Sequence, residues 1–352
     1  MAGKKTTVII IDDSILFRKM LCDELKNHED IEVVATAPDP YIGKEKIVEF
    51  RPDVVVLDIE MPKMDGLTFL GILMKYYPLP IIIVSSLGQK SGEMAVKALE
   101  LGAAEVMAKP QGTLSVKEMS ARLADKIRAV STLHLLRRPA GSQNVLPAER
   151  PKQPGVLAGL KDRTVRKFGA IGASTGGTEA IREILQKLPA DMPPLVITQH
   201  MPPVFTKSFA DRLNGLCSLE VKEAEDGEPL TWGKALIAPG DYHMTVASNQ
   251  TGYRVVLNSA PPVHHQRPSV DVLFESVAKT AGAKAVGVLL TGMGKDGARG
   301  LLQMRNAGAL TLAQDEKSSV VYGMPKEAAS LGAAMRILPL DKIHEALLSA
   351  LV

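Results

Sequence analysis

Acidic side chains follow two short apolar runs near the start of the sequence. Asp12 and Asp13 come directly after VIII, and Asp58 comes directly after VVVL. The carboxyl ends of parallel strands meet at one edge of a sheet, so we expect these three carboxylates to lie close together. Such a cluster suits Mg²⁺, which prefers oxygen ligands and bridges to phosphate oxygens. One of the carboxylates would then be able to act as a nucleophile toward a phosphoryl group.

A hydroxyl and an ammonium group end the next apolar runs. Ser85 lies in IIIVSS, and Lys109 follows EVMA. Both groups are able to hold phosphoryl oxygens, as the electrostatic stabilisation of phosphoryl transfer requires. A single acid or hydroxyl at a strand end is more often a solvated loop residue than a ligand. Five suitable groups at four strand ends favour a phosphorylation site instead.

A serine in a glycine-rich segment follows a later apolar run. Ser174 is the third residue of GASTGG, which comes after FGAI and before a helical pattern. This is the G-x-S-x-G pattern, which exposes a serine on a sharp strand-to-helix turn. Amides at the helix start, notably that of Thr175, would point toward a developing oxyanion. Taken alone, a Gly-Ser turn before a helix is more often a helix cap than a nucleophile.

A serine nucleophile needs a base, and a histidine stands at the end of the next expected strand. His200 ends LVITQH, so it would lie beside Ser174 at the same sheet edge. Asp296 lies in VGVLLTGMGKDG, in the loop after a strongly apolar run, and it is placed to orient the imidazole. The order Ser, His, Asp differs from the order in α/β-hydrolases, which indicates a distinct fold with the same chemistry.

The segment around Asp296 also supports a second interpretation. Gly292, Gly294 and Gly297 spell G-x-G-x-x-G after a strand, and Asp315 ends the following strand. That pattern is typical of dinucleotide binding, and by itself it indicates a nucleotide site and a triad loop about equally. The serine segment favours the triad, because a cofactor site would not require a serine and a histidine at these positions.

Length and composition predict two globular domains. The chain has 352 residues, of which 45% are apolar and 23% are charged. The formal charge of +3 comes from residues 131–168, which hold eight Lys or Arg and only two Asp or Glu. A DNA-reading domain would carry its own basic face, so nucleic acid is disfavoured as a partner. No apolar run spans a bilayer and no signal-type cleavage site follows the start, so we expect a cytoplasmic protein without membrane insertion.

The elements that must position these groups alternate between strand and helix patterns. Five βα units over residues 1–136 predict a doubly wound parallel sheet. Residues 137–165 are rich in Pro, Gly and basic side chains and indicate a flexible linker. Residues 166–352 predict a second doubly wound, mainly parallel α/β domain, with a small antiparallel insertion near residues 220–258.

The first domain resembles the response-regulator receiver family over nearly all of residues 6–130. The matching segments are IDDS, LDIEMPKMDG, VSS and AKP. The resemblance implies a flavodoxin-like fold with a five-stranded parallel sheet and Asp58 as the phospho-acceptor. It also implies Mg²⁺ ligands at Asp12, Asp13 and Asp58 and a switch pair of Ser85 and Lys109. Glu60, two residues after the phospho-acceptor, would either contact the metal or alter the lifetime of the phosphoryl group.

The second domain resembles the CheB family, the protein-glutamate methylesterases of bacterial chemotaxis, from about Phe168 to the carboxyl end. The matching segments are IGASTGG, TQHMP, APGDYHM, HHQRPSVDVLF and TGMGKDG. The resemblance implies hydrolysis of glutamate γ-methyl esters, and deamidation of glutamines, on methyl-accepting chemoreceptors. The implied residues are a triad of Ser174, His200 and Asp296, with the amides of Thr175 and Met293 holding the oxyanion.

The resemblance also implies control and partners. A histidine kinase of CheA type would phosphorylate the receiver with Mg²⁺ as cofactor, and ester hydrolysis would need no cofactor. The substrate would be the cytoplasmic domain of a chemoreceptor. We expect the unphosphorylated receiver to pack over the Ser174 loops and phosphorylation to weaken that packing. A second domain that only docks a partner would instead keep full biological function after Ser174→Ala.

Overall fold

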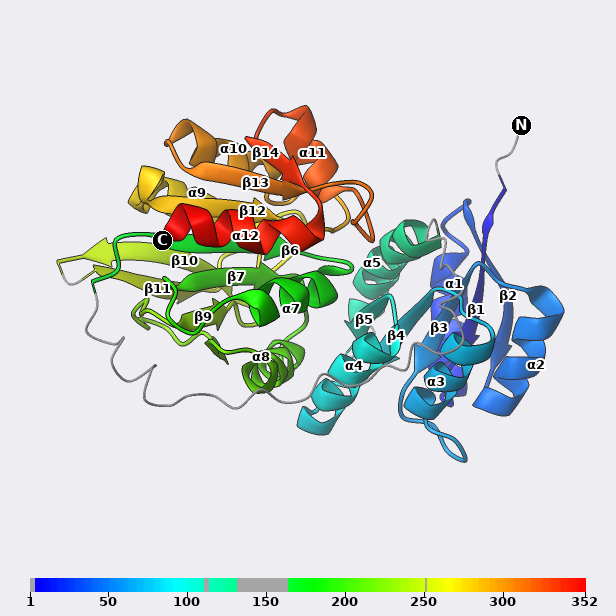
Figure 1. Ribbon diagram of the computed structural model, residues 1–352. Helices are drawn as coiled ribbons and strands as arrows, with labels where there is room; N and C mark the ends of the chain where they lie inside the picture. Colours follow the sequence, from blue (N-terminus) through cyan, green and yellow to red (C-terminus); the bar gives the residue numbers. More distant parts are fainter. Residues whose placement is uncertain (1–3, 111–113, 132–163, 251) are drawn as a thin grey trace. The chain divides into compact units, whose positions relative to one another are not determined.

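The computed structural model describes residues 4–110, 114–131, 164–250 and 252–352 (Figure 1). The chain divides into two compact units, Met1–Asn144 and Val145–Val352. The predicted linker, residues 137–165, lies outside the described residues except for its last two positions. The domain limits at residues 136 and 166 therefore stay predictions.

The first unit is built on a five-stranded parallel sheet. Its strand order is β2-β1-β3-β4-β5, the flavodoxin-like order, and this confirms the predicted fold class. The apolar runs form the strands because they are covered on both faces. The strands are β1 (Thr6–Ile11), β2 (Ile31–Ala37), β3 (Val54–Asp58), β4 (Ile81–Ser85) and β5 (Glu105–Ala108).

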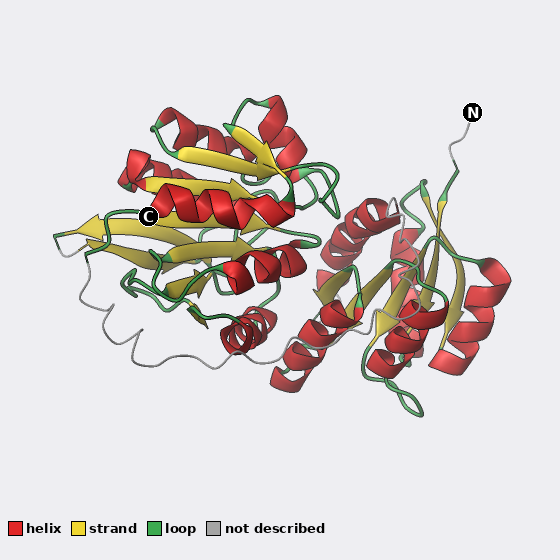
Figure 2. Cartoon of the chain, viewed as in Figure 1, coloured by secondary structure: helices red, strands yellow, loops and turns green. Residues whose placement is uncertain are grey.

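Helices cover both faces of this sheet (Figure 2). Side chains of α1 and α5 pack on one face, against alternate strand residues such as Val8 and Val56. The remaining helices pack on the other face. Three of the helices begin where Ser14, Asp39 and Asp65 accept hydrogen bonds from backbone amides of the first turn. The helices are α1 (Ile15–Leu25), α2 (Pro40–Phe50), α3 (Gly66–Tyr76), α4 (Gln89–Leu101) and α5 (Leu114–Ser131).

The second unit is built on a seven-stranded parallel sheet. Its strand order is β14-β13-β12-β6-β7-β9-β8. A separate antiparallel hairpin of β10 and β11 confirms the predicted insertion. The strands are β6 (Phe168–Ala173), β7 (Leu195–Gln199), β8 (Glu220–Glu223), β9 (Lys234–Ile237), β10 (His243–Asn249), β11 (Gly252–Asn258), β12 (Ala285–Leu289), β13 (Leu310–Gln314) and β14 (Arg336–Leu338).

The insertion is smaller than the sequence indicated. The prediction placed it over residues 220–258, but β8 and β9 lie parallel to their neighbours and belong to the main sheet. Only residues 243–258 form the antiparallel pair. The first part of that range was wrong because the direction of a four-residue strand is set by the sheet it joins and not by its own residue pattern.

The helices of the second unit also cover both faces of the sheet (Figure 1). One side holds α9, α10, α11 and the hairpin, over a core in which Phe168 packs 4.9 Å from the ring of Tyr253. No helix in the described ranges combines the length and hydropathy needed to cross a bilayer. The helices are α7 (Gly177–Lys187), α8 (Phe205–Leu216), α9 (Val270–Thr280), a short η1 (Gly282–Lys284), α10 (Ala298–Asn306), α11 (Met324–Ser330) and α12 (Leu340–Leu351).

The strand order places a switch point at the centre of this sheet. The chain leaves β6 toward β7 on one side and later returns to form β12 on the other side. In open α/β sheets, ligands bind at the carboxyl ends of strands where the order reverses in this way. The loops after β6, β7 and β12 are therefore the expected place for a site.

Candidate functional site

The predicted acidic cluster is present at the carboxyl edge of the first sheet. Each of Asp12, Asp13 and Asp58 has a carboxylate oxygen within 4.8 Å of the others. Asp12 and Asp58 are buried, whereas Asp13 is exposed. Lys109 Nζ lies 2.7 Å from Asp12 and 2.6 Å from Asp58. These residues fit Mg²⁺, because the oxygen donors converge and the open side of the cluster leaves room for water ligands.

The charge state of Asp58 follows from its surroundings. Burial and the neighbouring negative charge of Asp12 raise the pKa of Asp58 from 3.8 to about 6, although the ammonium of Lys109 acts in the opposite direction. Burial also opposes the charge of Lys109, but its two carboxylate partners outweigh that effect and raise the pKa of its ammonium group. Asp58 is thus a buried carboxyl group next to a second acid and one ammonium group. A cation or a phosphoryl group bound there would strongly change the charge around it.

Ser85 and Glu60, the other residues singled out in the receiver sequence, have surroundings that differ from those of the acidic cluster. Ser85 is fully buried, and its hydroxyl has no hydrogen-bond partner among the described residues. The Ser85 carbonyl accepts a hydrogen bond from the backbone N–H of Lys109 at 2.7 Å, so the two members of the predicted switch pair are linked. The Glu60 carboxylate accepts hydrogen bonds from Ser86 at 2.8 Å and Ser91 at 2.9 Å. It is not part of the convergent acidic group.

Ser174 lies on a tight turn between β6 and α7. Its N–H donates to the Thr291 carbonyl at 3.0 Å, and its carbonyl accepts from the N–H of Gly177 at 2.7 Å. The Gln199 side-chain amide donates to the Ser174 carbonyl at 2.9 Å and to the His200 carbonyl at 3.3 Å. The turn is therefore held from both neighbouring strands, and Gln199 is a supporting residue that the sequence did not reveal.

His200 and Asp296 meet next to this turn. Ala173 and Gln199 pair across β6 and β7, so Ser174 and His200 each follow a paired residue. His200 Nε2 lies 2.7 Å from Asp296 Oδ2, and both side chains are buried. Burial disfavours the charge of Asp296, but hydrogen bonds from His200 and from backbone amides outweigh burial and keep the pKa of Asp296 below 3.8. The described residues contain no hydrogen bond between the Ser174 hydroxyl and His200.

The loop that carries Asp296 presses against the serine turn. A Cβ on Gly292 would lie 2.7 Å from the Ser174 Cβ and 2.3 Å from the sulfur of Met324, so only glycine fits there. Met293 follows directly, which brings its backbone near the serine, although the role of the Met293 and Thr175 amides stays a prediction. Asp315, the acid of the nucleotide interpretation, caps its own turn by accepting from the N–H and the hydroxyl of Ser318. This packing favours the triad over the nucleotide site.

Comparison with known families matches each unit separately. Residues 8–120 match the response regulator receiver domain, and residues 169–347 match the CheB methylesterase. The matched methylesterase region includes the serine turn, His200 and Asp296. The chain belongs to the CheB methylesterase family. The two resemblances inferred from the sequence are thereby confirmed, and this family member is a methylesterase with a receiver domain.

Relatives of this methylesterase match it over nearly the whole chain. A protein-glutamate methylesterase/protein-glutamine glutaminase 2 of Syntrophus aciditrophicus is 51% identical over 343 residues, which are 97% of this chain and 98% of that one. A protein-glutamate methylesterase/protein-glutamine glutaminase of Escherichia coli K12 is 49% identical over 350 residues, or 98% and 97% of the two chains. The catalytic domain of Thermotoga maritima CheB methylesterase covers 52% of this chain and 97% of its own, with 41% identity and a TM-score of 0.51.

The methylesterase unit contains a cradle for Asp296 that the sequence analysis missed. Asp296 Oδ1 accepts from the Ser269 hydroxyl at 2.8 Å and from the Asp271 N–H at 2.9 Å, and Oδ2 accepts from the Val270 N–H at 2.7 Å. All three donors come from the start of α9. A serine after a proline and before an apolar helical run was a helix-start signal, but it did not show which loop the helix would face.

Proposed function

We propose that this chain hydrolyses γ-methyl esters of glutamates, and deamidates glutamines, on the cytoplasmic domains of methyl-accepting chemoreceptors when its receiver is phosphorylated. Family membership and the names of the full-length relatives support the substrate class. The contact of His200 with Asp296, beside the serine turn, is the observation that carries the chemical proposal.

Acylation begins with the Ser174 hydroxyl. His200 uses Nε2 for its bond to Asp296, so Nδ1 is the ring nitrogen that accepts the serine proton. The serine oxygen bonds to the ester carbonyl carbon and forms a tetrahedral intermediate. Asp296 fixes the tautomer and stabilises the imidazolium. When the intermediate collapses, the bond to the methoxy group breaks and His200 returns the proton to the leaving methanol, or to ammonia when glutamine is the substrate.

Deacylation repeats these steps with water. His200 removes a proton from a water molecule, which attacks the acyl-serine, and the proton then returns to the serine oxygen. The backbone amides of Thr175 and Met293 are the proposed donors to the oxyanion in both halves, and such donors typically contribute about 10²–10³-fold each to kcat. The proposed hydrolysis uses no cofactor.

Phosphorylation is proposed to occur on Asp58. A carboxylate oxygen attacks the phosphorus of a phosphohistidine on a kinase of CheA type, and the histidine leaves. Asp12, Asp13 and Asp58 would hold Mg²⁺, which would neutralise charge on the phosphoryl oxygens when bound. The Lys109 ammonium and the Ser85 hydroxyl then bind phosphoryl oxygens. The orphaned hydroxyl of Ser85 supports this role, because a buried donor without a partner gains most from a new acceptor.

The receiver is proposed to restrain the hydrolase until Asp58 is phosphorylated. The chain would meet both the kinase and the receptor segment in the cytoplasm. Restraint by the receiver predicts that phosphorylation raises kcat, kcat/KM or both, since it biases an equilibrium between restrained and free forms.

The test is methanol release from methyl-labelled chemoreceptor membranes. The full-length chain, Ser174→Ala and Asp58→Asn are compared with and without acetyl phosphate and Mg²⁺. Release should vanish in Ser174→Ala, and on addition of acetyl phosphate it should rise in the wild type but not in Asp58→Asn. A Ser208→Ala variant, altered on α8, controls for loss of a serine elsewhere in the same unit. Release that is independent of Ser174 would disprove the proposed triad, and a response that persists in Asp58→Asn would disprove the proposed phosphorylation site.

A further inference from the structure

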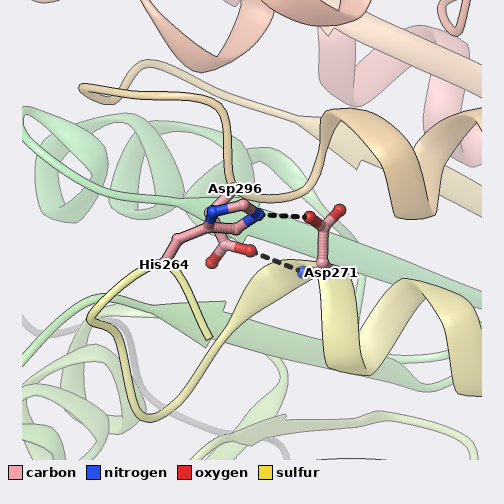
Figure 3. Close-up of side chains that lie close together, drawn as sticks. All are labelled: His264, Asp271 and Asp296. Atoms are coloured by element: carbon pink, nitrogen blue, oxygen red, sulfur yellow. Dashed lines mark hydrogen bonds and ion pairs between the residues drawn. The ribbon is translucent and has the colours of Figure 1, made fainter. Parts of the chain in front are cut away.

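The start of α9, which holds Asp296 by hydrogen bonds, is itself held in place by a second acid. Asp271 donates its N–H to Asp296, and its own side chain is buried. Asp271 Oδ1 accepts the N–H of Gly300 at 2.7 Å, which ties the start of α9 to the first turn of α10. Asp271 Oδ2 lies 3.2 Å from Nε2 of His264 (Figure 3). Asp271 therefore connects the Asp296 carboxylate to a histidine outside the triad.

This arrangement places two carboxylates in a small buried space. Ligand atoms of His264, Asp271 and Asp296 all lie within 4.8 Å of one another. Burial and the charge of Asp296 raise the pKa of Asp271, whereas the contact with His264 acts to lower it. On the other side Asp296 faces His200. The charged residues nearest to Asp296 in sequence, Lys295 and Arg299, are exposed, and Arg267, nearest to His264, pairs with Asp241. Of these neighbours, His264 is the one whose ring N–H contacts the second acid.

The backbone conformation at His264 indicates that the surrounding structure holds this residue in place. Val263 and Gln266 pair through two backbone hydrogen bonds, and His264 and His265 between them have φ values of 51° and 60°. Left-handed residues at both central positions of such a turn are usually Asn or Gly. Strained conformations of this kind persist where the surroundings hold them. Here His264 is partly buried against Asp271, whereas His265 is exposed.

We propose that His264 is a positioning residue for the hydrolysis: its contact with Asp271 fixes the start of α9, and that start holds Asp296 toward His200. The inference rests on the proposed function, because it gives His264 a role only if Asp296 and His200 belong to a working triad. Asp296 accepts four hydrogen bonds already, so the His264 cluster is a brace and not a site for an added ligand.

The two adjacent histidines provide a matched test in the full-length chain. His264→Asn keeps a residue that tolerates positive φ, but its short amide does not reach where Nε2 lies. His265→Asn makes the same change one residue later. His264→Gln restores a donor near the position of Nε2. We expect kcat to fall by about 10–100-fold in His264→Asn, with KM changed less than about threefold. His265→Asn and His264→Gln should stay near wild type.

A spectroscopic measurement separates positioning from simple loss of stability. The ring N–H that His200 donates to Asp296 should give a low-field proton resonance in protein labelled at histidine, assigned by its loss in His200→Gln. That resonance should shift or broaden in His264→Asn and stay in place in His265→Asn. Equal kcat values and an unchanged resonance in both Asn variants would overturn the proposal. If Ser174→Ala still released methanol, the triad would fail instead, and the resonance would still decide whether His264 holds Asp296.

Discussion

His200 contacts Asp296 through Nε2, at 2.7 Å, and this contact determines which ring nitrogen is left for Ser174. In the chymotrypsin arrangement the aspartate binds Nδ1 and the serine faces Nε2. Here the imidazole has the opposite orientation, because the loop after β12 brings the Asp296 carboxylate to Nε2 and not to Nδ1. The proposed base is therefore Nδ1, so the proposed hydrolysis would use the opposite tautomer from chymotrypsin.

Replacing Asp296 by Asn tests this tautomer. The amide would present an N–H group to His200 Nε2 or to the donors of α9, so the ring would lose its acceptor or the cradle would contain two donors facing each other. We expect kcat for methanol release to fall by about 10³–10⁴-fold with KM little changed. Asp191→Asn, at an exposed residue of the same unit, should leave kcat unchanged. A fall below tenfold in Asp296→Asn would contradict the proposed role.

The pKa of Asp58 predicts how Mg²⁺ binding depends on pH. Near pH 6 the Asp58 carboxyl begins to hold a proton, and this proton competes with the cation for the same oxygens. The apparent Kd for Mg²⁺ should rise by about tenfold for each pH unit below this value. Calorimetric titration of the unphosphorylated chain in buffers of different ionisation enthalpy measures both affinity and proton release. Asp58→Asn should bind Mg²⁺ weakly and without this pH dependence; an equal dependence in the variant would assign the proton to another group.

Residue order predicted the places of the functional side chains, because a parallel sheet gathers the carboxyl ends of its strands at one edge. Asp12, Asp58 and Lys109 come from three strands of the first sheet, and His200 and Asp296 meet at the edge of the second. For Asp12, Asp58, Lys109 and His200 the position at or next to a strand end was sufficient, and for Asp296 the position in the loop after an apolar strand. No side-chain orientation had to be known.

The supporting contacts were not predictable in the same way. The Asp271 N–H at the start of α9 meets Asp296 (Figure 3). This contact depends on the packing of α9 beside α10, which local sequence patterns do not show. Likewise, β8 and β9 were expected in an antiparallel insertion, and they proved parallel because the sheet, and not the strand, sets direction. Local patterns thus indicated which candidate residues come together, while tertiary packing decided which residues hold them.

The charge at Asp58 should also reduce the stability of the receiver unit. A carboxyl whose pKa is raised from 3.8 to about 6 binds more protons in the folded state than in the unfolded state between these pH values. Folding stability therefore falls as pH rises through this window, and the loss is complete above it. Asp58→Asn removes the charge, so the receiver should become more stable at pH 8, by about 3 kcal/mol, and gain little near pH 4.

Differential scanning calorimetry of the full-length chain without Mg²⁺ measures this effect. Asp65→Asn is a control of opposite sign, because hydrogen bonds from Thr68 lower the pKa of the Asp65 carboxyl. That variant should not gain stability at pH 8. If Asp58→Asn lowered the unfolding temperature of the receiver transition at pH 8, the contact with Lys109 would outweigh burial and crowding.

Gly292 provides a test of the packing between the Asp296 loop and the serine turn. An added Cβ would lie 2.7 Å from the Ser174 Cβ and 3.1 Å from its backbone nitrogen, so Gly292→Ala must displace Ser174. We expect kcat to fall by about 100-fold and the free energy of unfolding to fall by about 1–3 kcal/mol. Gly215→Ala on α8 is the matched control, since a Cβ there meets nothing within 4 Å. It should keep full activity and gain about 0.5–1 kcal/mol of stability. Equal activities in the two variants would mean that the serine turn does not depend on this close approach.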